Sequence, residues 1–269
     1  MEKTLKMIDS NEIRRIAGEE SLDVSMLEKD YVLGWILYGI SKSSIGNKLA
    51  FKGGTALSKI YFPGKWRLSE DLDFTLIDDI GWGNIIGALK NEVPGLVQDA
   101  IGISISLRPK PHTNPDYLQA KMKYIGPVNP NTVKIEVTRE KFQGELIEKL
   151  VPKKFDYPQF SVKVYSLENI IAEKTRAIIE RGYIRDYYDV WRLLKTQKHD
   201  RRKTKELFLE KCKAKGITYA GIDQFFPKNI VTELERYLDT GLTRLSREPL
   251  MPLQNIIDEL KKLLKEFLE

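Results

Sequence analysis

The chain has 269 residues, 42% of them hydrophobic and 30% charged, which is typical of a soluble protein with one large domain or two smaller ones. The single cysteine excludes an internal disulfide and, with only two histidines, a Cys/His zinc site, and the longest apolar run, Val32–Ile40, is too short to span a bilayer. The N-terminus lacks the apolar core of a signal peptide, so we expect a cytoplasmic protein, and the net charge of 44 − 38 = +6 fits either a polyanionic partner or an ordinary lysine-rich surface.

The first part of the chain alternates helical and strand-like patterns. A short helix is expected within residues 2–17 and a longer one over residues 26–42, where Ser25 and Glu28 have the spacing of a capping box. Beyond the stretch 48–76, which is treated below, a helix begins at Trp82 and is interrupted by Pro94. Alternating residues then predict half-buried strands of a mixed or largely antiparallel sheet, at 101–107, 117–125, 131–138 and 160–165, with proline-rich loops at 108–116 and 151–159.

From Ser166 onward the pattern is helical. Ser166 is a suitable N-cap and Gly182 a suitable stop for a helix over residues 167–181. Further helices are expected at 185–195, 204–214, 228–240 and 251–268. The change of pattern predicts two domains, a mixed α/β domain over residues 1–160 and a helical domain over residues 161–269.

The most informative stretch is residues 48–76, which contains two carboxylates on one expected strand. Over residues 68–76, Asp71 and Asp73 are two positions apart, so their side chains should project from the same face. Carboxylates that close repel each other unless a positive group lies between them. A hard divalent cation is the simplest such group, and it usually brings phosphates with it.

A glycine pair precedes these carboxylates. A short apolar run, Leu49–Phe51, meets Gly53 and Gly54, and Thr55 then opens a helix-compatible segment. Glycine lets the backbone approach a ligand closely, and the N–H groups at the start of a helix attract anions. Glycine pair and carboxylate pair, in this order and this close, predict a metal–phosphate site of the kind used in nucleotidyl transfer.

The motifs KGGTAL, which begins at Lys52, and RLSEDLDF, which begins at Arg67, resemble those of the AbiEii-type nucleotidyltransferase toxins of abortive-infection and type IV toxin–antitoxin systems, to which the MenT toxins are related. Two later segments, IIAEKTRAII and RDYYDVWRLL, resemble the other two motifs of this family. The resemblance runs from about Lys52 to about Leu194. It implies an α+β protein in which a polymerase-β-like mixed-sheet domain is followed by a helical bundle that closes the active-site cleft.

The resemblance also implies a reaction and its partners. A hydroxyl group, foremost the 3′ end of a tRNA, would attack the α-phosphate of a nucleoside triphosphate with the help of Mg²⁺ or Mn²⁺, and a cognate antitoxin would be the protein partner. Enzymes of this fold usually place a third metal-binding carboxylate on a neighbouring strand. Glu136, on the polar face of the strand 131–138, is the best candidate, and the alternative is an exposed strand glutamate.

Lys174 and two aspartates are the candidates in the helical part. Lys174 lies within an apolar helical stripe, so its side chain must either extend to solvent or meet negative charge. The matching lysine of the family is an active-site residue, which favours a role on the triphosphate. Asp186, with Arg185 beside it, is expected to face the nucleotide site, and Asp189 is kept as a possible site residue. The alternative makes Asp186 an N-cap and Asp189 a first-turn carboxylate.

The complete set of expected site residues follows from these arguments. Catalytic roles are assigned to Asp71, Asp73, Lys174 and Asp186, metal binding to Asp71, Asp73 and Glu136, and nucleotide binding to Lys52, Gly53, Gly54, Thr55, Arg67, Ser69 and Lys174. Arg67 could instead be a surface arginine. The basic run 195–205 is either a solvated segment or an RNA-backbone contact. Two other functions stay open, a kinase-like transfer of phosphate to a protein hydroxyl such as Ser69, and a non-catalytic module that binds RNA or an antitoxin.

Overall fold

The computed structural model describes residues 5–142, 144–155 and 157–269. The chain forms two compact units. The first extends to Val164, apart from Gly144 and Glu145, which belong with the second unit, Tyr165–Glu269. No helix in the described part of the chain is long and apolar enough to cross a membrane.

The first unit is built on a mixed sheet. Its strands are β1 (Leu49–Lys52), β2 (Asp71–Leu76), β3 (Ser104–Leu107), β4 (His112–Asn114), β5 (Tyr117–Ile125), β6 (Pro130–Thr138), β7 (Leu146–Leu150) and β8 (Ser161–Tyr165). Their order is β3-β5-β6-β2-β1-β8-β7, with β4 paired to β5. The central strand β2 runs antiparallel to β1 and parallel to β6, while β5 is antiparallel to β3, β4 and β6.

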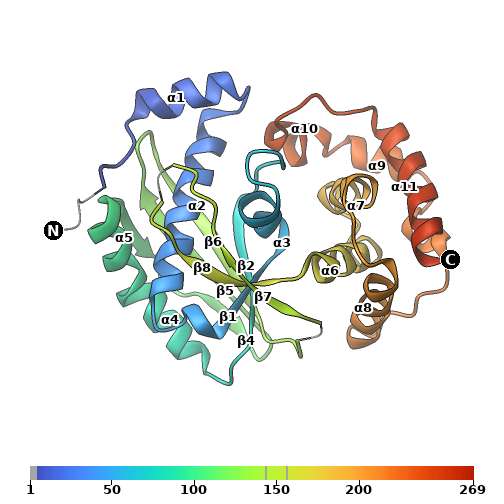
Figure 1. Ribbon diagram of the computed structural model, residues 1–269, viewed down its shortest axis with the longest axis horizontal. Helices are drawn as coiled ribbons and strands as arrows, with labels where there is room; N and C mark the ends of the chain where they lie inside the picture. Colours follow the sequence, from blue (N-terminus) through green and yellow to red (C-terminus); the bar gives the residue numbers. More distant parts are fainter. Residues whose placement is uncertain (1–4, 143, 156) are drawn as a thin grey trace. The chain divides into compact units, whose positions relative to one another are not determined.

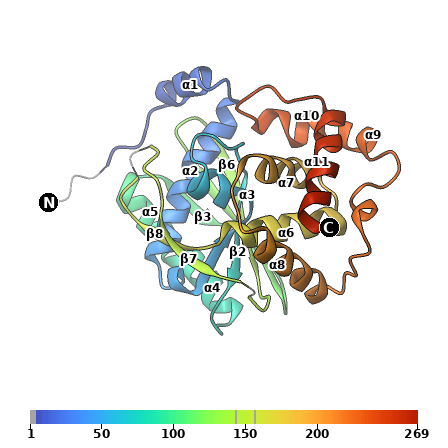
Figure 2. The same cartoon turned by 45° about the vertical axis from the view of Figure 1, so that its right-hand side comes forward.

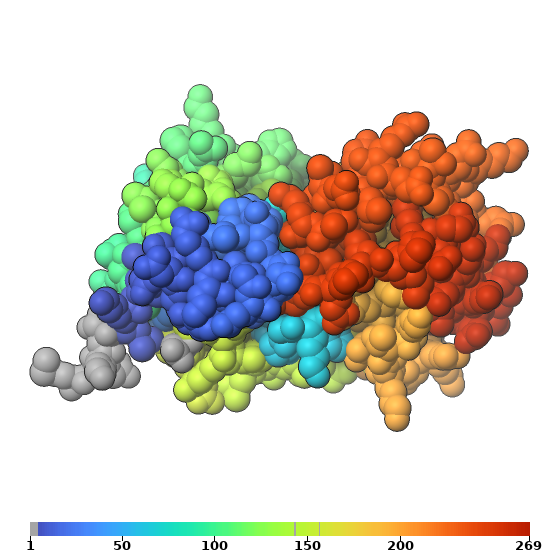
Figure 3. All heavy atoms as spheres, turned by 90° about the horizontal axis from the view of Figure 1, so that it is seen from above, coloured from blue at the N-terminus to red at the C-terminus, as the bar shows by residue number. Residues whose placement is uncertain are grey.

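Helices cover the apolar face of this sheet (Figure 1). The helices of the first unit are α1 (Ser10–Glu19), α2 (Val24–Lys42), α3 (Gly53–Ala56), α4 (Trp82–Asn91) and α5 (Val93–Ile101). The 3-10 turn η1 (Gly46–Lys48) precedes β1, and a π-helical turn, η2 (Leu57–Tyr61), continues α3. Side chains such as Leu72, Ile135 and Ala120 alternate along the strands and are completely buried on the face covered by α2, α4 and α5. In the space-filling view the N-terminal helices, in blue, lie on the surface of this unit (Figure 3).

The start of α2 differs from the capping-box prediction. Its N-cap is Asp23, which accepts hydrogen bonds from the backbone N–H groups of Ser25 and Met26. Glu28 is completely buried and instead accepts from the N–H groups of Val128 and Asn129, at 2.6 and 3.0 Å. A tertiary contact with a loop therefore takes the glutamate that local spacing assigned to the cap.

Several boundaries also differ from expectation. The first helix covers Ser10–Glu19; of the expected span 2–17, residues 5–9 are not helical and residues 2–4 lie outside the described residues. Pro94 stands in the first turn of a separate helix, α5, where proline is tolerated. Helix α5 extends to Ile101 and ends at Gly102 with φ +79°, so β3 starts only at Ser104. Strands β4 and β7 have no counterpart among the expected strands, and β2 starts at Asp71 rather than at residue 68.

The second unit is helical. It consists of α6 (Leu167–Glu180), α7 (Ile184–Thr196), α8 (Arg201–Ala214), η3 (Ile222–Phe225), α9 (Ile230–Glu235), α10 (Leu238–Gly241), η4 (Thr243–Leu245) and α11 (Leu253–Leu268). Helix α6 packs on α7 and α8, and α11 packs on α7, which Figure 2 shows from a second direction. Ser166 caps α6 as predicted, whereas the expected helix over residues 228–240 is broken into α9 and α10. The predicted fold class, a mixed sheet followed by helices, is confirmed.

Candidate active site

Asp71 and Asp73 project from the polar face of the central strand β2, as the spacing predicts. Their neighbours Leu72 and Phe74 are buried on the opposite face. The register places Asp73 between Lys52 of β1 and Glu136 of β6. Register partners project from the same side of a sheet, so the predicted metal-binding carboxylates occupy one surface of adjacent strands.

Lys134 supplies the positive charge beside two of these carboxylates. Its Nζ atom lies 3.3 Å from Asp71 Oδ2 and 3.0 Å from Glu136 Oε1. Burial raises the pKa of Asp71 and outweighs the opposing charge of Lys134. Burial also acts to raise the pKa of Glu136, but hydrogen bonds from Tyr117 and Gln119, together with Lys134, bring it below the usual value. Glu136 is therefore a bonded member of the cluster and not an isolated surface glutamate.

The carboxylates on this face can supply only part of a metal's coordination shell. Among the described residues, no group of three or more His, Cys, Asp or Glu side chains is arranged to hold a metal. Mg²⁺ typically binds one or two protein carboxylates and completes its shell with water and substrate phosphates. The oxygen donors of Asp71 and Asp73 fit that smaller requirement, and Lys134 neutralises part of the same cluster.

The glycine pair lies directly against this cluster. Gly53 has φ +75°, and a Cβ atom at this position would lie 2.3 Å from Asp73 Oδ2. A Cβ on Gly54 would lie 3.1 Å from Ser69 Oγ and 3.2 Å from Arg67 Nη2. The absence of side chains thus lets the turn after β1 pack against the segment that leads into β2. The hydroxyl of Thr55 donates to the backbone oxygen of Asp71, which ties the two motifs together.

Three expected nucleotide-binding residues are more buried than a surface role would allow. Arg67 is only 2% exposed, donates from Nη1 to the carbonyl oxygen of Leu68 at 3.0 Å, and is not a surface arginine. Ser69 is buried as well and precedes the strand instead of lying on it. Lys52 is buried at the end of β1. Arg67 and Ser69 face Gly54, so the structure brings these two side chains to the glycine turn.

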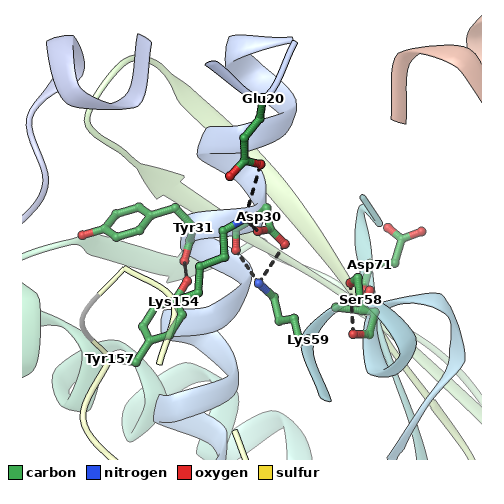
Figure 4. A network of polar contacts seen from close by, with 9 residues as sticks. Glu20, Asp30, Tyr31, Ser58, Lys59, Asp71, Lys154 and Tyr157 are labelled. Carbon is green, nitrogen blue, oxygen red and sulfur yellow. Dashed lines mark hydrogen bonds and ion pairs between the residues drawn. The ribbon is translucent and has the colours of Figure 1, made fainter. Parts of the chain in front are cut away.

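A buried ion pair, which the sequence analysis did not identify, joins the segment that follows the glycine turn to helix α2. Lys59 of η2 donates to the carboxylate of Asp30 at 2.8 Å and to its backbone oxygen at 2.7 Å. Figure 4 shows Lys59 pointing away from Asp71 and toward Asp30 on α2, where Lys154 provides a second cation at 3.4 Å. Both charged positions lie within apolar helical stretches, which is the signal that identified Lys174 and that would also have identified this pair.

In the second unit, Lys174 meets negative charge and does not extend to solvent. Its Nζ atom lies 3.3 Å from Asp186 Oδ1 and 2.9 Å from Asp189 Oδ2, and both aspartates are almost completely buried. Asp186 also accepts from Arg181 at 2.8 Å. Burial acts to raise the pKa of Asp186, but Lys174 and Arg181 together keep it below the usual value.

The alternative interpretation of these aspartates is wrong in its details. The N-cap of α7 is Tyr183, and Asp186 lies in the first helical turn. Asp189 lies beyond that turn and is completely buried. The structure therefore brings together Lys174, Asp186 and Asp189 within α6 and α7, as one buried cluster of charges.

A mixed sheet with paired carboxylates beside a glycine turn suits chemistry on phosphates with a divalent cation. Residues 35–266 match the model of the family described as "Nucleotidyl transferase AbiEii toxin, Type IV TA system". The chain belongs to this family and is a nucleotidyltransferase, so the resemblance of its motifs is confirmed.

Solved structures support the fold. MenT4, the nucleotidyltransferase toxin Rv2826c from Mycobacterium tuberculosis H37Rv, is similar with a TM-score of 0.66 at 16% identity, over 97% of this chain and 100% of that chain. JHP933 from Helicobacter pylori is similar with a TM-score of 0.56 at 20% identity, over 92% of this chain and 93% of that chain. No curated protein matches the sequence.

Proposed function

We propose that the protein transfers the nucleoside monophosphate of a nucleoside triphosphate to a hydroxyl group of RNA, with the 3′ end of a tRNA as the preferred acceptor. The hydroxyl oxygen forms a bond to the α-phosphorus, and pyrophosphate leaves. The observation that carries the proposal is the close approach of Gly53 to Asp73, because it joins a turn suited to phosphate with a carboxylate suited to a metal. Membership of the AbiEii family supports it.

Asp71 and Asp73 would hold Mg²⁺ or Mn²⁺ directly, and Glu136 on the next strand would be the third carboxylate beside the ion. When bound, the ion would lower the pKa of the attacking hydroxyl and neutralise charge on the leaving pyrophosphate. Lys134 holds Asp71 and Glu136 on one face of the sheet. The backbone of Gly53 and Gly54, and the buried guanidinium of Arg67 beside them, would bind triphosphate oxygens. Lys52, Thr55 and Ser69 complete this nucleotide-binding set.

Lys174 and Asp186 are proposed to serve the same reaction. Lys174 would bind the triphosphate and stabilise the charge that develops during transfer, while Asp186, and Asp189 with it, would fix the position of the ammonium group. Their motifs support this role through the family match, which includes both helices. In this proposal the expected domain of residues 1–160 would bind the metal and the nucleotide, and the expected domain of residues 161–269 would supply Lys174 and its aspartates.

Two partners complete the proposal. The protein would act as the toxin of a toxin–antitoxin or abortive-infection system, in the cytoplasm, where triphosphates and tRNA are present. A cognate antitoxin would control it. The family match supports a type IV system, in which an antitoxin is the expected second component.

The test is incubation of the purified protein with total tRNA, Mg²⁺ and each nucleoside triphosphate, labelled with ³²P at the α or the γ position. Label from the α position should appear on RNA, and Asp71→Ala should abolish it. Asp99→Ala, which removes an exposed carboxylate of the same unit, should retain full transfer. Label that appears only from the γ position, and on protein, would replace the proposal with kinase-like transfer. RNA that binds without any labelling would favour the non-catalytic module.

A further inference from the structure

A basic pocket lies at the far end of the sheet from the glycine turn. It has a volume of about 340 Å³ and is lined by the segment Arg108–His112 and by Gln119 and Lys121 of β5. Within the part of the chain that the structure describes, the side chains of Arg108, Lys110 and Lys121 have no carboxylate partner. Three uncompensated cations around one cavity make it a suitable receptor for an anion.

The backbone holds this pocket in a defined shape. Strands β3 and β4 both pair with β5, and Arg108 donates its N–H to the carbonyl oxygen of Lys121 at 2.8 Å. The chain between the two strands contains Pro109 and Pro111, whose rings fix φ, and Lys110 between them has φ +58°. A stiff loop of this kind loses little conformational entropy when a ligand binds.

The sheet register connects the pocket to the carboxylates. Asp73, Glu136, Gln119 and His112 are successive register partners across β2, β6, β5 and β4. Their side chains therefore share one face, and Gln119 both lines the pocket and donates to Glu136 at 2.9 Å. Three strand spacings of roughly 4.8 Å separate Asp73 from His112, which is about 14 Å.

The two anion-binding features lie on opposite sides of the carboxylate strand. The glycine turn follows β1, which borders β2 on one side, and the pocket belongs to β4 and β5, beyond β6 on the other side. A triphosphate at the glycine turn would leave the β6 side of Asp71 and Asp73 for the acceptor. Of the two reactants, the acceptor RNA is the one with further phosphates along its backbone, beyond the hydroxyl that reacts.

We infer that the Arg108–Lys121 pocket binds a backbone phosphate of the acceptor RNA, upstream of its reacting 3′ end. This inference rests on the proposed function for the identity of the acceptor. The separation of about 14 Å between Asp73 and His112 can be spanned by a few nucleotides of a single strand. A contact with a backbone phosphate depends on charge and is independent of base sequence, so it contributes to the affinity for any RNA of sufficient length.

The experiment measures RNA binding apart from catalysis. Fluorescently labelled total tRNA is titrated with Asp73→Asn protein, with and without Arg108→Gln, Lys110→Gln and Lys121→Gln together, over a series of salt concentrations. The triple variant should bind more weakly, and its slope of log affinity against log salt should decrease in magnitude by about 0.7 to 1, the change expected for the one phosphate that the variant no longer neutralises. The matched control removes the same charge from other exposed lysines of the same unit, by glutamine at Lys42, Lys90 and Lys153.

Further measurements distinguish phosphate binding in the pocket from a folding defect. Lys110→Arg with Lys121→Arg should retain binding, and circular dichroism should show that the triple variant is folded. In the active protein, the triple variant should raise KM for acceptors long enough to reach the pocket and leave KM for a mononucleotide acceptor unaffected. Unchanged tRNA affinity and salt slope would overturn the inference, as would loss of antitoxin binding alone. Weaker tRNA binding without any nucleotidyl transfer would refute the proposed function and leave the pocket as an RNA site.

Discussion

The contact between Gly53 and Asp73 gives the sharpest test of the site. Gly53→Ala would place a Cβ atom 2.3 Å from Asp73 Oδ2, whereas such contacts are essentially never shorter than 3.0 Å. The carboxylate or the turn must therefore shift by at least 3.0 − 2.3 = 0.7 Å. Gly64→Ala is a matched control, because Gly64 has φ +72°, nearly the same as the +75° of Gly53, and nothing lies within 4 Å of its added Cβ.

The two substitutions should differ in activity far more than in stability. Each forces alanine into the left-handed region, which costs about 1–2 kcal/mol. Gly53→Ala should cost an additional 0.5–1.5 kcal/mol or so, because Asp73 must leave its preferred rotamer. A carboxylate misplaced by nearly 1 Å lowers the rate of a positioned reaction by about 10²-fold. We therefore expect Gly53→Ala to lose about 10²-fold in kcat/KM, while Gly64→Ala stays within about threefold of the unmodified protein.

Urea unfolding measures the loss of stability, and transfer of α-labelled nucleotide to tRNA measures the loss of kcat/KM. If Gly53→Ala matched Gly64→Ala in both, the glycine turn would have no part in positioning Asp73, and the observation that carries the proposed function would be lost. If Gly53→Ala lost activity only through unfolding, the loss would disappear on cooling, and the same conclusion would follow.

Three other buried or bridging lysines give predictions of their own. Lys174→Met should lower the free energy of unfolding by about 3 kcal/mol in urea titrations, because buried Asp189 loses the cation 2.9 Å away and buried Asp186 keeps Arg181 without Lys174. A loss below about 1 kcal/mol would show that the remaining partners of the two aspartates are sufficient. Lys134→Met should lower the Mg²⁺ concentration for half-maximal transfer about fivefold, since one positive charge near the proposed metal-binding carboxylates is removed. An increase would assign the lysine a direct role in substrate binding. Lys59→Met should cost about 3 kcal/mol in free energy of unfolding, because buried Asp30 then keeps only the more distant Lys154, at 3.4 Å. Adding Asp30→Leu should recover most of that loss if the poorly compensated carboxylate is its source.

The parts of the site that follow from periodicity could be predicted from the sequence. The period of two along a strand places Asp71 and Asp73 on one face, and the helical period places Lys174 in a stripe where it needs negative charge. The identity of that negative charge could not be predicted. Asp189 proved to be the nearer of the two aspartates, at 2.9 Å, because the packing of α6 on α7 decides which carboxylate reaches the lysine.

Strand β4 was not predicted, because its side chains show no alternation of buried and exposed positions. All three residues of β4, His112–Asn114, are exposed, so the strand exists only through its backbone pairing with β5. Arg67 and Ser69 are buried next to Gly54, and no local pattern in the sequence records this close approach. Contacts of this kind depend on which segments the fold brings together, and a single sequence does not specify them.

The same alternation specifies both the core of the first unit and its chemistry. A shift of β2 by one residue against β1 and β6 would bring Leu72 and Phe74 to the polar face and turn Asp71 and Asp73 into the face packed by helices. That register would bury two carboxylates and remove Lys134 from its partners, so it is strongly disfavoured. Because β6 carries Glu136 and pairs with Gln119 of β5, the register of β2 also determines which side chains link the carboxylates to the basic pocket. Glycine turn, carboxylates and pocket are thus placed by one set of strand pairings, and the packing of the hydrophobic core keeps that set unique.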